Sequence, residues 1–314
     1  MKDQDTIYII GAGAIGKALA VFLKLKNKKV IIIRGSVDDN SNITEDIEVE
    51  ISSSKTLTAT IEVSTASNFS TLDGIILFTN KSFGNYQLSQ ALSSKCQNSP
   101  VVILQNGLDV EQPFIDNGFS QIYRTVIFAS SQPVAPNKFR FKPVEPSPIG
   151  IIKGDTHTQE MIARELTSHY FEFISVQNIL PLIWTKTIVN CVFNSVCPLL
   201  ETDNGIFHRD ENALHIATGV IAECVLIANK VGIPIEVEEV ADKLLKISRS
   251  GDGRLISTYQ DILNKRETEI ESLNFAVVKI AKELNGENPV IQTKLLGELV
   301  KLKSQLTRPF NTSL

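Results

Sequence analysis

Three polar side chains at four-residue spacing are the feature of this chain best suited to chemistry. Lys186, Asn190 and Asn194 recur inside the segment 184–194, where nearly every other position is apolar. If the segment is a helix, these side chains span an arc of about 80° and point in one direction. Buried polar groups need hydrogen-bond partners, so the partner is either a substrate or another polar group of the protein core.

Lys186 is the candidate proton donor of this stripe. Hydride transfer to a ketone builds negative charge on the oxygen, so a cation or proton donor must lie within hydrogen-bonding distance of it. Removal from water would lower the pKa of a lysine towards the working pH and make it a better general acid. A short-chain-dehydrogenase site is disfavoured because no tyrosine is followed by lysine four residues later, and the histidine and cysteine spacings predict no metal site.

A glycine-rich turn near the amino terminus predicts a dinucleotide site. The run Gly11-Ala12-Gly13-Ala14-Ile15-Gly16 follows an apolar strand at 7–10 and precedes a helical pattern at 18–25. In this context Gly11 permits the tight turn, Gly13 lets the backbone approach a pyrophosphate, and Gly16 allows close packing of helix on strand. With a second strand at 30–33, the segment is predicted to be a βαβ unit.

The residue after the second strand, Arg34, indicates which dinucleotide binds. An arginine suits a 2′-phosphate, whereas a carboxylate would pair with the ribose 2′-hydroxyl of NAD. Arg34 therefore predicts NADPH as the cofactor. Asp38 and Asp39 lie slightly further along and keep NAD as the alternative, with Arg34 simply solvated.

The rest of the first half predicts a doubly wound sheet. Further strands are expected at 74–79, 101–104, 124–129 and 173–176, with extra antiparallel strands covering the domain at 139–154 and a helix at 157–173. Ligands bind at the carboxyl ends of such strands, so Lys81 and Asn106 are placed to reach cofactor or substrate. An ordinary Asn-Gly turn is the alternative for Asn106-Gly107.

From residue 180 onward the apolar spacing is helical. Helices are expected at 180–196, 215–231, 237–248, 268–284 and 288–303, with Pro198 breaking the first helix's continuation. We therefore predict an α/β, Rossmann-type doubly wound domain over residues 1–178, followed by an all-α substrate domain over 179–314.

Composition and charge narrow the class of protein. Hydrophobic residues make up 43% and charged residues 21%, as in folded proteins of this length. The net charge of −4, with basic residues dispersed, disfavours nucleic acid as a partner. Four cysteines without a C-x-x-C pair are expected to be buried thiols, and no apolar run approaches the roughly 18 residues needed to cross a bilayer. We expect a cytoplasmic protein without a membrane partner; the sequence leaves the oligomeric state open, a homodimer included.

Taken together, these residues resemble the ketopantoate reductase (2-dehydropantoate 2-reductase) family. The match runs in order from about Ile7 to Ala281 and includes Gly11–Gly16, Arg34, Lys81, Gln105-Asn106-Gly107, Trp184-Thr185-Lys186, Asn190-Cys191, Asn194, Asn204-Gly205, Ser257, Gln260-Asp261 and Thr268-Glu269-Ile270. The resemblance implies a 6-phosphogluconate-dehydrogenase-like fold. It also implies NADPH-dependent reduction of 2-dehydropantoate to pantoate, a step towards pantothenate and coenzyme A.

The resemblance also implies individual roles. Lys186 would be the proton donor, Glu269 would contribute to catalysis, and Lys81 would lie by the nicotinamide and substrate. The substrate's hydroxyl and carboxylate would be held by Asn106, Asn190, Asn194 and Ser257, with Asn204 a weaker candidate.

Two features leave alternatives open. Glu269 could instead stabilise the start of the predicted helix at 268–284, where Thr268 and Glu271 fit a capping box. Phe275 stands where the family often has glycine, which adds a large side chain near the expected cleft wall or domain contact. A reductase of a different small 2-oxo acid, or an NADP-binding relative without activity, therefore remain alternatives to ketopantoate reduction.

Overall fold

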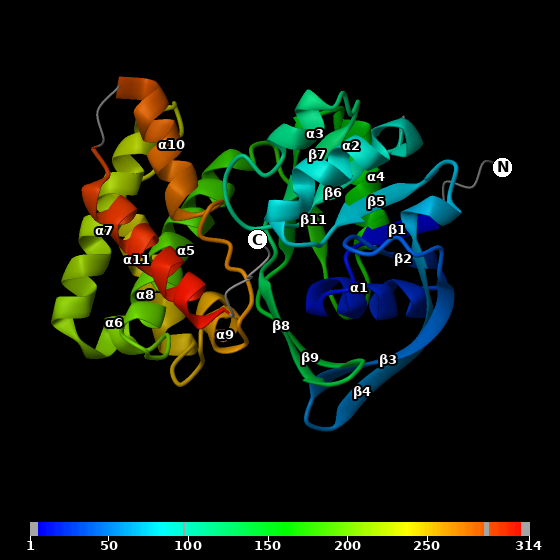
Figure 1. Ribbon diagram of the computed structural model, residues 1–314, viewed down its shortest axis with the longest axis horizontal. Coiled ribbons are helices and arrows are strands. Elements are labelled where there is room, and N and C mark those ends of the chain that lie inside the picture. The colour runs from blue at the N-terminus through cyan, green and yellow to red at the C-terminus, as the bar shows by residue number, and fades with distance from the viewer. Residues whose placement is uncertain (1–5, 97, 286–288, 309–314) are drawn as a thin grey trace, which may run out of the picture. The chain divides into compact units, whose positions relative to one another are not determined.

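The computed structural model describes residues 6–96, 98–285 and 289–308. They divide into two compact units: a sheet unit, Met1–Gln105 with Val110–Ile179, and a helical unit, Asn106–Asp109 with Leu180–Leu314 (Figure 1). The sequence predicts a single change of unit after residue 178. In the structure the sheet unit ends at Ile179, one residue later. Residues Asn106–Asp109 also belong to the helical unit, so one boundary in the sequence does not separate the two units.

The sheet unit is a doubly wound α/β structure, as predicted. Within its described residues the strand order is β11-β10-β7-β6-β5-β1-β2-β4-β3-β9-β8, and the run from β7 to β4 is parallel. The strands are β1 Thr6–Ile10, β2 Lys29–Arg34, β3 Asn42–Ser52, β4 Lys55–Thr65, β5 Ile75–Phe78, β6 Val101–Ile103, β7 Ile122–Thr125, β8 Ala129–Ala135, β9 Lys138–Pro143, β10 Ser147–Lys153 and β11 Phe173–Ser175.

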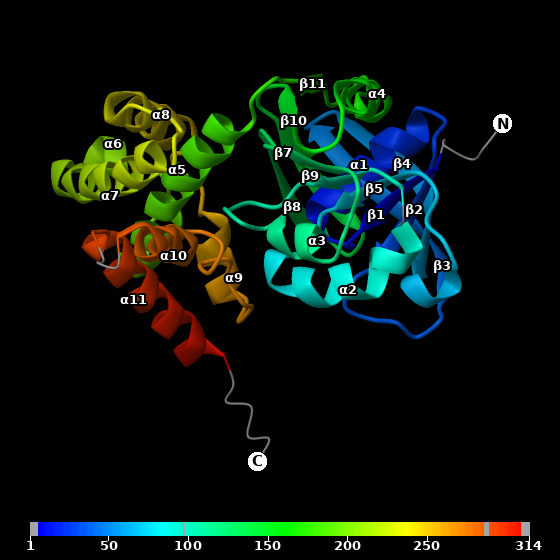
Figure 2. The same ribbon diagram turned by 90° about the horizontal axis from the view of Figure 1, so that it is seen from above.

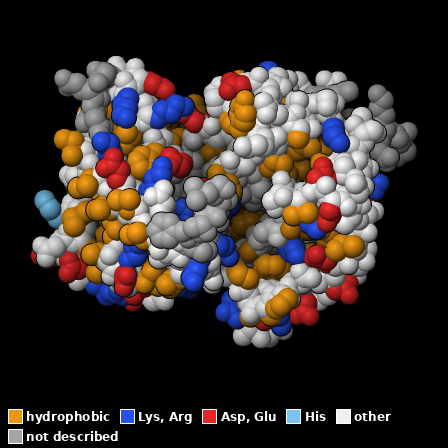
Figure 3. Space-filling view, viewed as in Figure 1, with side chains coloured by type: hydrophobic (Ala, Val, Ile, Leu, Met, Phe, Trp, Pro, Cys, Tyr) orange, Lys and Arg blue, Asp and Glu red, His pale blue; other side chains and the backbone are white. Residues whose placement is uncertain are grey.

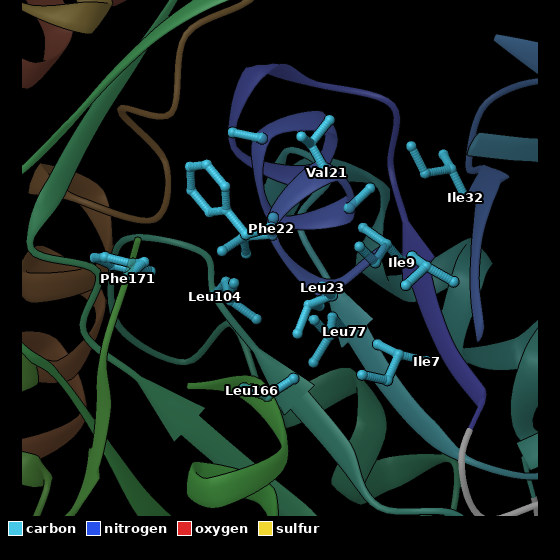
Figure 4. Packing of buried hydrophobic residues seen from close by; sticks show 14 of the residues in the cluster. Ile7, Ile9, Val21, Phe22, Leu23, Ile32, Leu77, Leu104, Leu166 and Phe171 are labelled. Carbon is cyan, nitrogen blue, oxygen red and sulfur yellow. The ribbon is translucent and has the colours of Figure 1, made fainter. Parts of the chain in front are cut away.

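Helices cover both faces of this sheet because its central strands are apolar on both sides. Along β1, Ile7 and Ile9 pack with α1 (Ala14–Leu25) and α4 (Thr156–Leu166), whereas Tyr8 and Ile10 pack with α2 (Asn85–Cys96) and α3 (Gln112–Asp116). Figure 4 shows the first of these cores, with Phe22 of α1 among the side chains of the strands. Short 3₁₀ turns, η1 and η2, occupy Ala66–Asn68 and Ser82–Gly84.

Several predictions for the sheet unit are wrong in detail. The long antiparallel hairpin β3–β4 was not among the predicted elements, although apolar and charged residues alternate along β3 as they do in a half-exposed strand. The strands at 138–153 extend the edges of the sheet and do not cover it, and the strand expected at 124–129 is β7, which ends at Thr125. Helix α4 ends at Leu166 because the Thr167 hydroxyl bonds the Ala163 carbonyl and accepts from the Phe173 amide.

The helical unit is all-α, as predicted. It comprises α5 Leu180–Leu199, α6 Ile206–Arg209, α7 Glu211–Lys230, α8 Val237–Ser250, α9 Ser257–Leu263, α10 Asn274–Asn285 and α11 Ile291–Thr307. Figure 2 shows α5 running between α6–α8 and α9–α11, and α5 contacts α7, α8, α9 and α11. By length and composition alone α7 could cross a membrane, but it packs against α5, α6, α8, α10 and α11 as a core helix.

The helical unit differs from the prediction at most of its helix ends and in its short helices. Pro198 does not break α5, which continues to Leu199, because a proline in the last turn removes only one helical hydrogen bond. Helix α9 was not expected. Helix α10 begins at Asn274, so the capping box expected at Thr268 and Glu271 is wrong: residues 269–273 form a bend and turns.

Candidate active site

The glycines in the turn of the sheet unit have two different roles. Gly11 has a φ of 110°, and a Cβ there would lie 2.6 Å from the Asn80 amide nitrogen. A Cβ on Gly16 would lie 2.5 Å from both the Gly11 carbonyl oxygen and the Thr79 hydroxyl. At Gly13, by contrast, a Cβ would meet no atom of the described chain within 4 Å. The fold therefore requires glycine at positions 11 and 16, where a side chain would overlap neighbouring atoms. At Gly13 a side chain would instead meet open space among the described residues.

The amino terminus of α1 is suited to an anion. Among the described residues no side chain caps it at Gly13, and its first turn carries no acidic residue. The first amides of a helix lack intrahelical acceptors and carry the positive end of the helix dipole. Ala12 and Gly13 are exposed, and Ala14 and Ile15 are partly so. The turn thus fits a dinucleotide's pyrophosphate, because its backbone is accessible from Ala12 to Ile15, where the first amides of α1 lie.

Two strand ends flank this turn. The Gly11 amide donates to the Ile33 carbonyl at 2.8 Å, which places the turn beside the end of β2 and Arg34. On the other side the Thr79 amide donates to the Ile10 carbonyl at 2.9 Å, which places it beside Asn80 and Lys81 after β5. The structure therefore brings Arg34 and Lys81 to the same edge of the sheet as the turn.

Arg34 is already paired within the sheet unit. One guanidinium nitrogen donates to the Asp39 carboxylate at 2.6 Å, and its Nε is buried without a partner among the described residues. Hydrogen bonding from Ser41, and then from Arg34, lowers the pKa of Asp39 to about 2. Asp38 accepts from the Ser67 hydroxyl and amide, which lowers its pKa as well. A cofactor's ribose would meet both signs of charge at this strand end.

A buried amide network, missed by sequence reasoning, holds the loops after β5 and β6. Asn85, only 2% exposed, donates to Gln105 Oε1 at 2.6 Å and to the Val110 carbonyl at 2.8 Å. Gln105 in turn donates to the Asn80 carbonyl at 2.8 Å. Arg124 supports it by bonding the Gln105 carbonyl and pairing with Glu111. The only signal in the sequence is a polar residue early in an otherwise ordinary helix.

In the helical unit, the stripe predicted from spacing lies on α5. Lys186 and Asn190 are partly buried, and Asn194 is 2% exposed. Asn194 Oδ1 accepts from the Ser257 hydroxyl and from the Thr258 amide, both at 3.3 Å. The side chain therefore caps the first turn of α9, and the structure brings two predicted substrate residues, Asn194 and Ser257, into contact.

The other amides of the set retain unused hydrogen-bonding groups. Within the described chain, neither Asn190 nor Asn106 makes a side-chain hydrogen bond, although both are partly buried, and Asn194 Nδ2 donates to no group there. Asn204 Oδ1 is buried without a partner in the same described ranges, while its backbone bonds Arg254 and Ser248. Of the two asparagines of the stripe, Asn194 is thus bonded within the described chain through its Oδ1, whereas no side-chain bond of Asn190 is found there.

The loop 106–109 packs on the turn that contains Glu269. Gly107 has a φ of 101°, and a Cβ there would overlap the Ser272 carbonyl oxygen, which also accepts from the Leu108 amide at 2.9 Å. Ser272 donates from its amide and hydroxyl to the Glu269 carbonyl, both at 3.1 Å. The backbone conformation and the contact with Ser272 therefore require glycine at position 107. Glu269 precedes α10 by five positions and is not a first-turn acid of that helix.

The contacts of Phe275 that the structure describes lie inside the helical unit. Its ring packs with the buried cluster of Ile262, Ile270 and Val300 inside the helical unit. It also lies against Gly297 of α11, and Lys301 Nζ stands 5.3 Å from the ring centroid. The large side chain is thus accommodated by a small residue on the facing helix.

Among the described residues, the cysteines and the clusters of acidic side chains indicate no second reactive site. All four cysteines are buried and unbridged, as predicted, and burial raises the pKa of Cys96 and Cys197 to about 12. Burial, followed by the neighbouring Cys224, raises the pKa of Cys191. Thiols held neutral in this way are poor nucleophiles. Among the described residues, no group of three or more His, Cys, Asp or Glu side chains could hold a metal ion.

Comparisons with known proteins agree with this architecture. A family model described as ketopantoate reductase PanE/ApbA matches residues 7–151, and the model of its C-terminal part matches residues 178–303. A 2-dehydropantoate 2-reductase of Pyrococcus abyssi is 28% identical over 301 residues, which cover 96% of this chain and 98% of that protein.

Solved structures share the fold over the same extent. A D-mandelate dehydrogenase with NADH and anilino(oxo)acetate has a TM-score of 0.83 at 23% identity and covers 96% of this chain and 99% of that one. A dimeric ketopantoate reductase from Staphylococcus aureus has a TM-score of 0.80 at 17% identity, with the same coverage. The two family models span most of the sequence, and the chain belongs to the ketopantoate reductase family of oxidoreductases.

Proposed function

We propose that this protein catalyses the NADPH-dependent reduction of 2-dehydropantoate to pantoate, in pantothenate and coenzyme A biosynthesis. The proposal is supported by the family and by the 28% identical relative of that name. It assigns the glycine turn to the cofactor and the polar side chains of the helical unit to a small 2-oxo acid.

The sheet unit supplies the groups that would hold NADPH. The backbone of Gly11–Gly16 would take the pyrophosphate, and Arg34 would take the 2′-phosphate. Lys81 would lie near the nicotinamide from the adjacent strand end. The bound nicotinamide would supply the hydride; everything else in the reaction falls to the side chains of this chain.

Lys186 would donate the proton. As the carbonyl carbon accepts a hydride, its oxygen gains negative charge, and the ammonium both stabilises this charge and delivers the proton that completes the alcohol. Ser257 and the amides of Asn106, Asn190, Asn194 and Asn204 would hold the substrate's carboxylate and hydroxyl. We propose that Glu269 contributes to catalysis.

One observation carries this assignment. Asn190 is a partly buried amide in the middle of α5, and its side chain bonds nothing in the described chain. Because the Asn190 side chain is only partly buried, water can bond its amide, and a ligand with matching donors and acceptors would take the place of that water. Because Asn190 lies one turn from both Lys186 and Asn194, the ligand that satisfies it would also reach these two side chains.

We also propose that the protein is a homodimer of a reducing, cytoplasmic compartment. The dimeric relative from Staphylococcus aureus supports the first part. Four buried, unbridged cysteines support the second.

The decisive experiment is NADPH oxidation with ketopantoate, repeated with NADH and with a panel of other 2-oxo acids. We expect ketopantoate to give the highest kcat/KM and NADPH to be preferred. A flat response to ketopantoate with turnover of another 2-oxo acid would redirect the substrate assignment. Tight NADPH binding without turnover of any 2-oxo acid would indicate a cofactor-binding relative and contradict the enzymatic proposal.

A variant tests the proton donor separately. Lys186→Ala should leave NADPH binding nearly unchanged and lower kcat by about 10²- to 10⁴-fold, because general acid catalysis is worth that much. Lys282→Ala, an exposed lysine on α10, is the matched control and should keep full activity. Unchanged turnover in Lys186→Ala would remove this residue from the mechanism.

A further inference from the structure

Helix α11 buries its small residues and exposes its large ones. The residues that it turns into the helical unit are Thr293, Gly297, Val300 and Ser304. On the opposite side stand five large aliphatic residues, Ile291, Leu295, Leu299, Leu302 and Leu306, which we call the α11 stripe. An amphipathic helix at the surface of a monomer normally shows the reverse arrangement.

The α11 stripe is continuous and strongly exposed. Its residues follow one another at spacings of three or four, so they form one row along the helix. Their exposed fractions are 68% for Ile291, 53% for Leu295, 42% for Leu299, 54% for Leu302 and 75% for Leu306. Figure 3 shows hydrophobic side chains gathered on the face of the helical unit over which α11 runs in Figure 1.

Polar anchors fix the rotation of α11 and thereby hold the stripe outward. Glu223 of α7 accepts from the Gln292 amide at 2.9 Å and from the Thr293 amide and hydroxyl at 2.8 Å. Asn274 donates to the Thr293 carbonyl at 3.1 Å. A Cβ on Gly297 would already lie 3.1 Å from the Asn274 Cβ and 3.5 Å from the Phe275 ring, so a leucine does not fit there on the inner face. Rotation of the stripe inward would break these contacts.

The size of the stripe suits an interface between proteins. Fifteen residues separate its ends, which corresponds to about 22 Å along a helix. Covering five such side chains would bury on the order of 500 Å² per copy, more than half of the ~800 Å² per partner that stable complexes bury. Exposed leucines on α7, by comparison, are isolated: Leu226 has no row of this kind.

We infer that the α11 stripe is the surface through which two copies of this chain associate. This inference rests on the homodimer proposed above and names its interface. The charges beside the stripe are self-complementary, because at helical spacing Glu298 lies along one edge and Lys303 along the other. Within one copy Glu298 pairs with Lys294 at 3.4 Å and Lys303 with Glu201 at 2.7 Å, so each charge would be shared between its own chain and the partner copy. When two copies meet stripe to stripe with α11 parallel, Glu298 of one copy reaches Lys303 of the other, five positions further along, as in parallel coiled coils.

The test is the oligomeric state of purified protein by light scattering at micromolar concentration. Wild type should be a dimer, and Leu295→Glu combined with Leu302→Glu should be a monomer, with the dimer Kd raised at least ~100-fold. Leu226→Glu, on an equally exposed position of α7, is the matched control and should stay dimeric. Leu302→Asn provides a milder variant, and thermal melting checks that each variant is folded.

Charge variants test the parallel arrangement. Glu298→Lys alone should weaken the dimer, because two lysines then face each other, and Glu298→Lys combined with Lys303→Glu should restore it. A failure to restore the dimer would contradict the parallel pairing.

Other outcomes overturn the inference in distinguishable ways. A monomeric wild type would remove both the homodimer and its interface, and binding of that monomer to anionic vesicles would assign the stripe to a membrane surface instead. A dimeric Leu295→Glu, Leu302→Glu variant would leave the homodimer standing but place its interface elsewhere. NADPH oxidation is a separate readout, so failure of the enzymatic proposal would not affect these results.

Discussion

The glycine turn of the sheet unit and the polar side chains of the helical unit differ in the chemical groups that they present. We call the second set, Lys186, Asn190, Asn194 and Ser257, the polar face. The turn offers backbone amides, and its side chains are small or absent. The polar face offers side chains, and the backbone of α5 is fully engaged in a helix. The first set of groups therefore comes from six consecutive residues, whereas the second combines side chains of α5 and α9 that packing brings together.

This difference determines how a substitution acts in each of the two units. In the turn, a substitution acts through the Cβ that it adds, because Gly11 and Gly16 have no room for one. In the polar face, a substitution acts through the hydrogen bond that it removes, and the effect depends on whether the partner belongs to the chain. Asn194 has partners within the chain, whereas Asn190 has none among the described residues.

The largest expected effect is within the glycine turn. Gly11→Ala places a Cβ 2.6 Å from the Asn80 amide at a φ of 110°, so the turn must distort. We expect dinucleotide affinity to fall at least ~100-fold and the melting temperature to drop. Gly13→Ala adds its Cβ in open space. It should leave stability within about 0.5 kcal/mol and lower only dinucleotide affinity, by roughly tenfold.

Fluorescence titration with NADPH and thermal melting measure both variants. Gly118→Ala is a control for left-handed backbone, because Gly118 has a φ of 77° and open space around it in the described chain. If Gly13→Ala bound NADPH as well as wild type does, the backbone at Gly13 would not face the pyrophosphate.

The contrast also shows how much the sequence could predict. The glycine turn and its flanking strands could be located because six adjacent residues specify them. The stripe on α5 could be located because helical spacing is local. Helix α9 was missed because it has only seven residues and because its first turn is capped by the side chain of Asn194, 63 positions before Ser257. No local sequence pattern indicates that contact.

Glu269 and Asn85 illustrate the limit of local patterns. Thr268 and Glu271 have the spacing of a capping box, yet the chain there turns back through hydrogen bonds from Ser272 to the Glu269 carbonyl. Asn85 supports the strand-end loops from within α2, but only the packing of α2 on the sheet shows that its amide is buried. In both cases the partner is decided by tertiary structure.

The next prediction distinguishes Asn190 from Asn194, the two asparagines of the stripe on α5. Asn190→Ala should lower kcat/KM by about 10- to 100-fold, because the substrate would lose a hydrogen bond. Stability should change little, because the Asn190 amide has no partner in the described chain. Asn194→Ala should also lower activity, but it should cost about 1 kcal/mol of stability, because it removes the cap of α9.

Steady-state kinetics and urea unfolding measure these two variants. Asn194→Asp keeps an acceptor for the α9 amide and should recover most of the stability without the activity, since the carboxylate would repel the substrate's own. Equal destabilisation by Asn190→Ala and Asn194→Ala would show that Asn190 is also a structural amide, and the comparison between them would fail.

The smallest expected effect concerns cofactor choice in the sheet unit. Arg34→Ala should lower the preference for NADPH over NADH by about tenfold, because the 2′-phosphate loses its guanidinium partner. Asp39→Asn should raise that preference by about threefold, because Asp39 shares Arg34 and repels the same phosphate.

The pH dependence sharpens this last test. The pKa of Asp39 is lowered to about 2, so the stability that its ionised form contributes is fully present above the ordinary pKa near 3.8 and is lost only as the pH falls through about 2. Between pH 5 and 9 Asp39 therefore keeps its charge, and the effect of Asp39→Asn on kcat/KM for NADPH relative to NADH should be constant. A ratio that converged on wild type as the pH fell towards 5 would mean that another carboxylate governs the ribose contact.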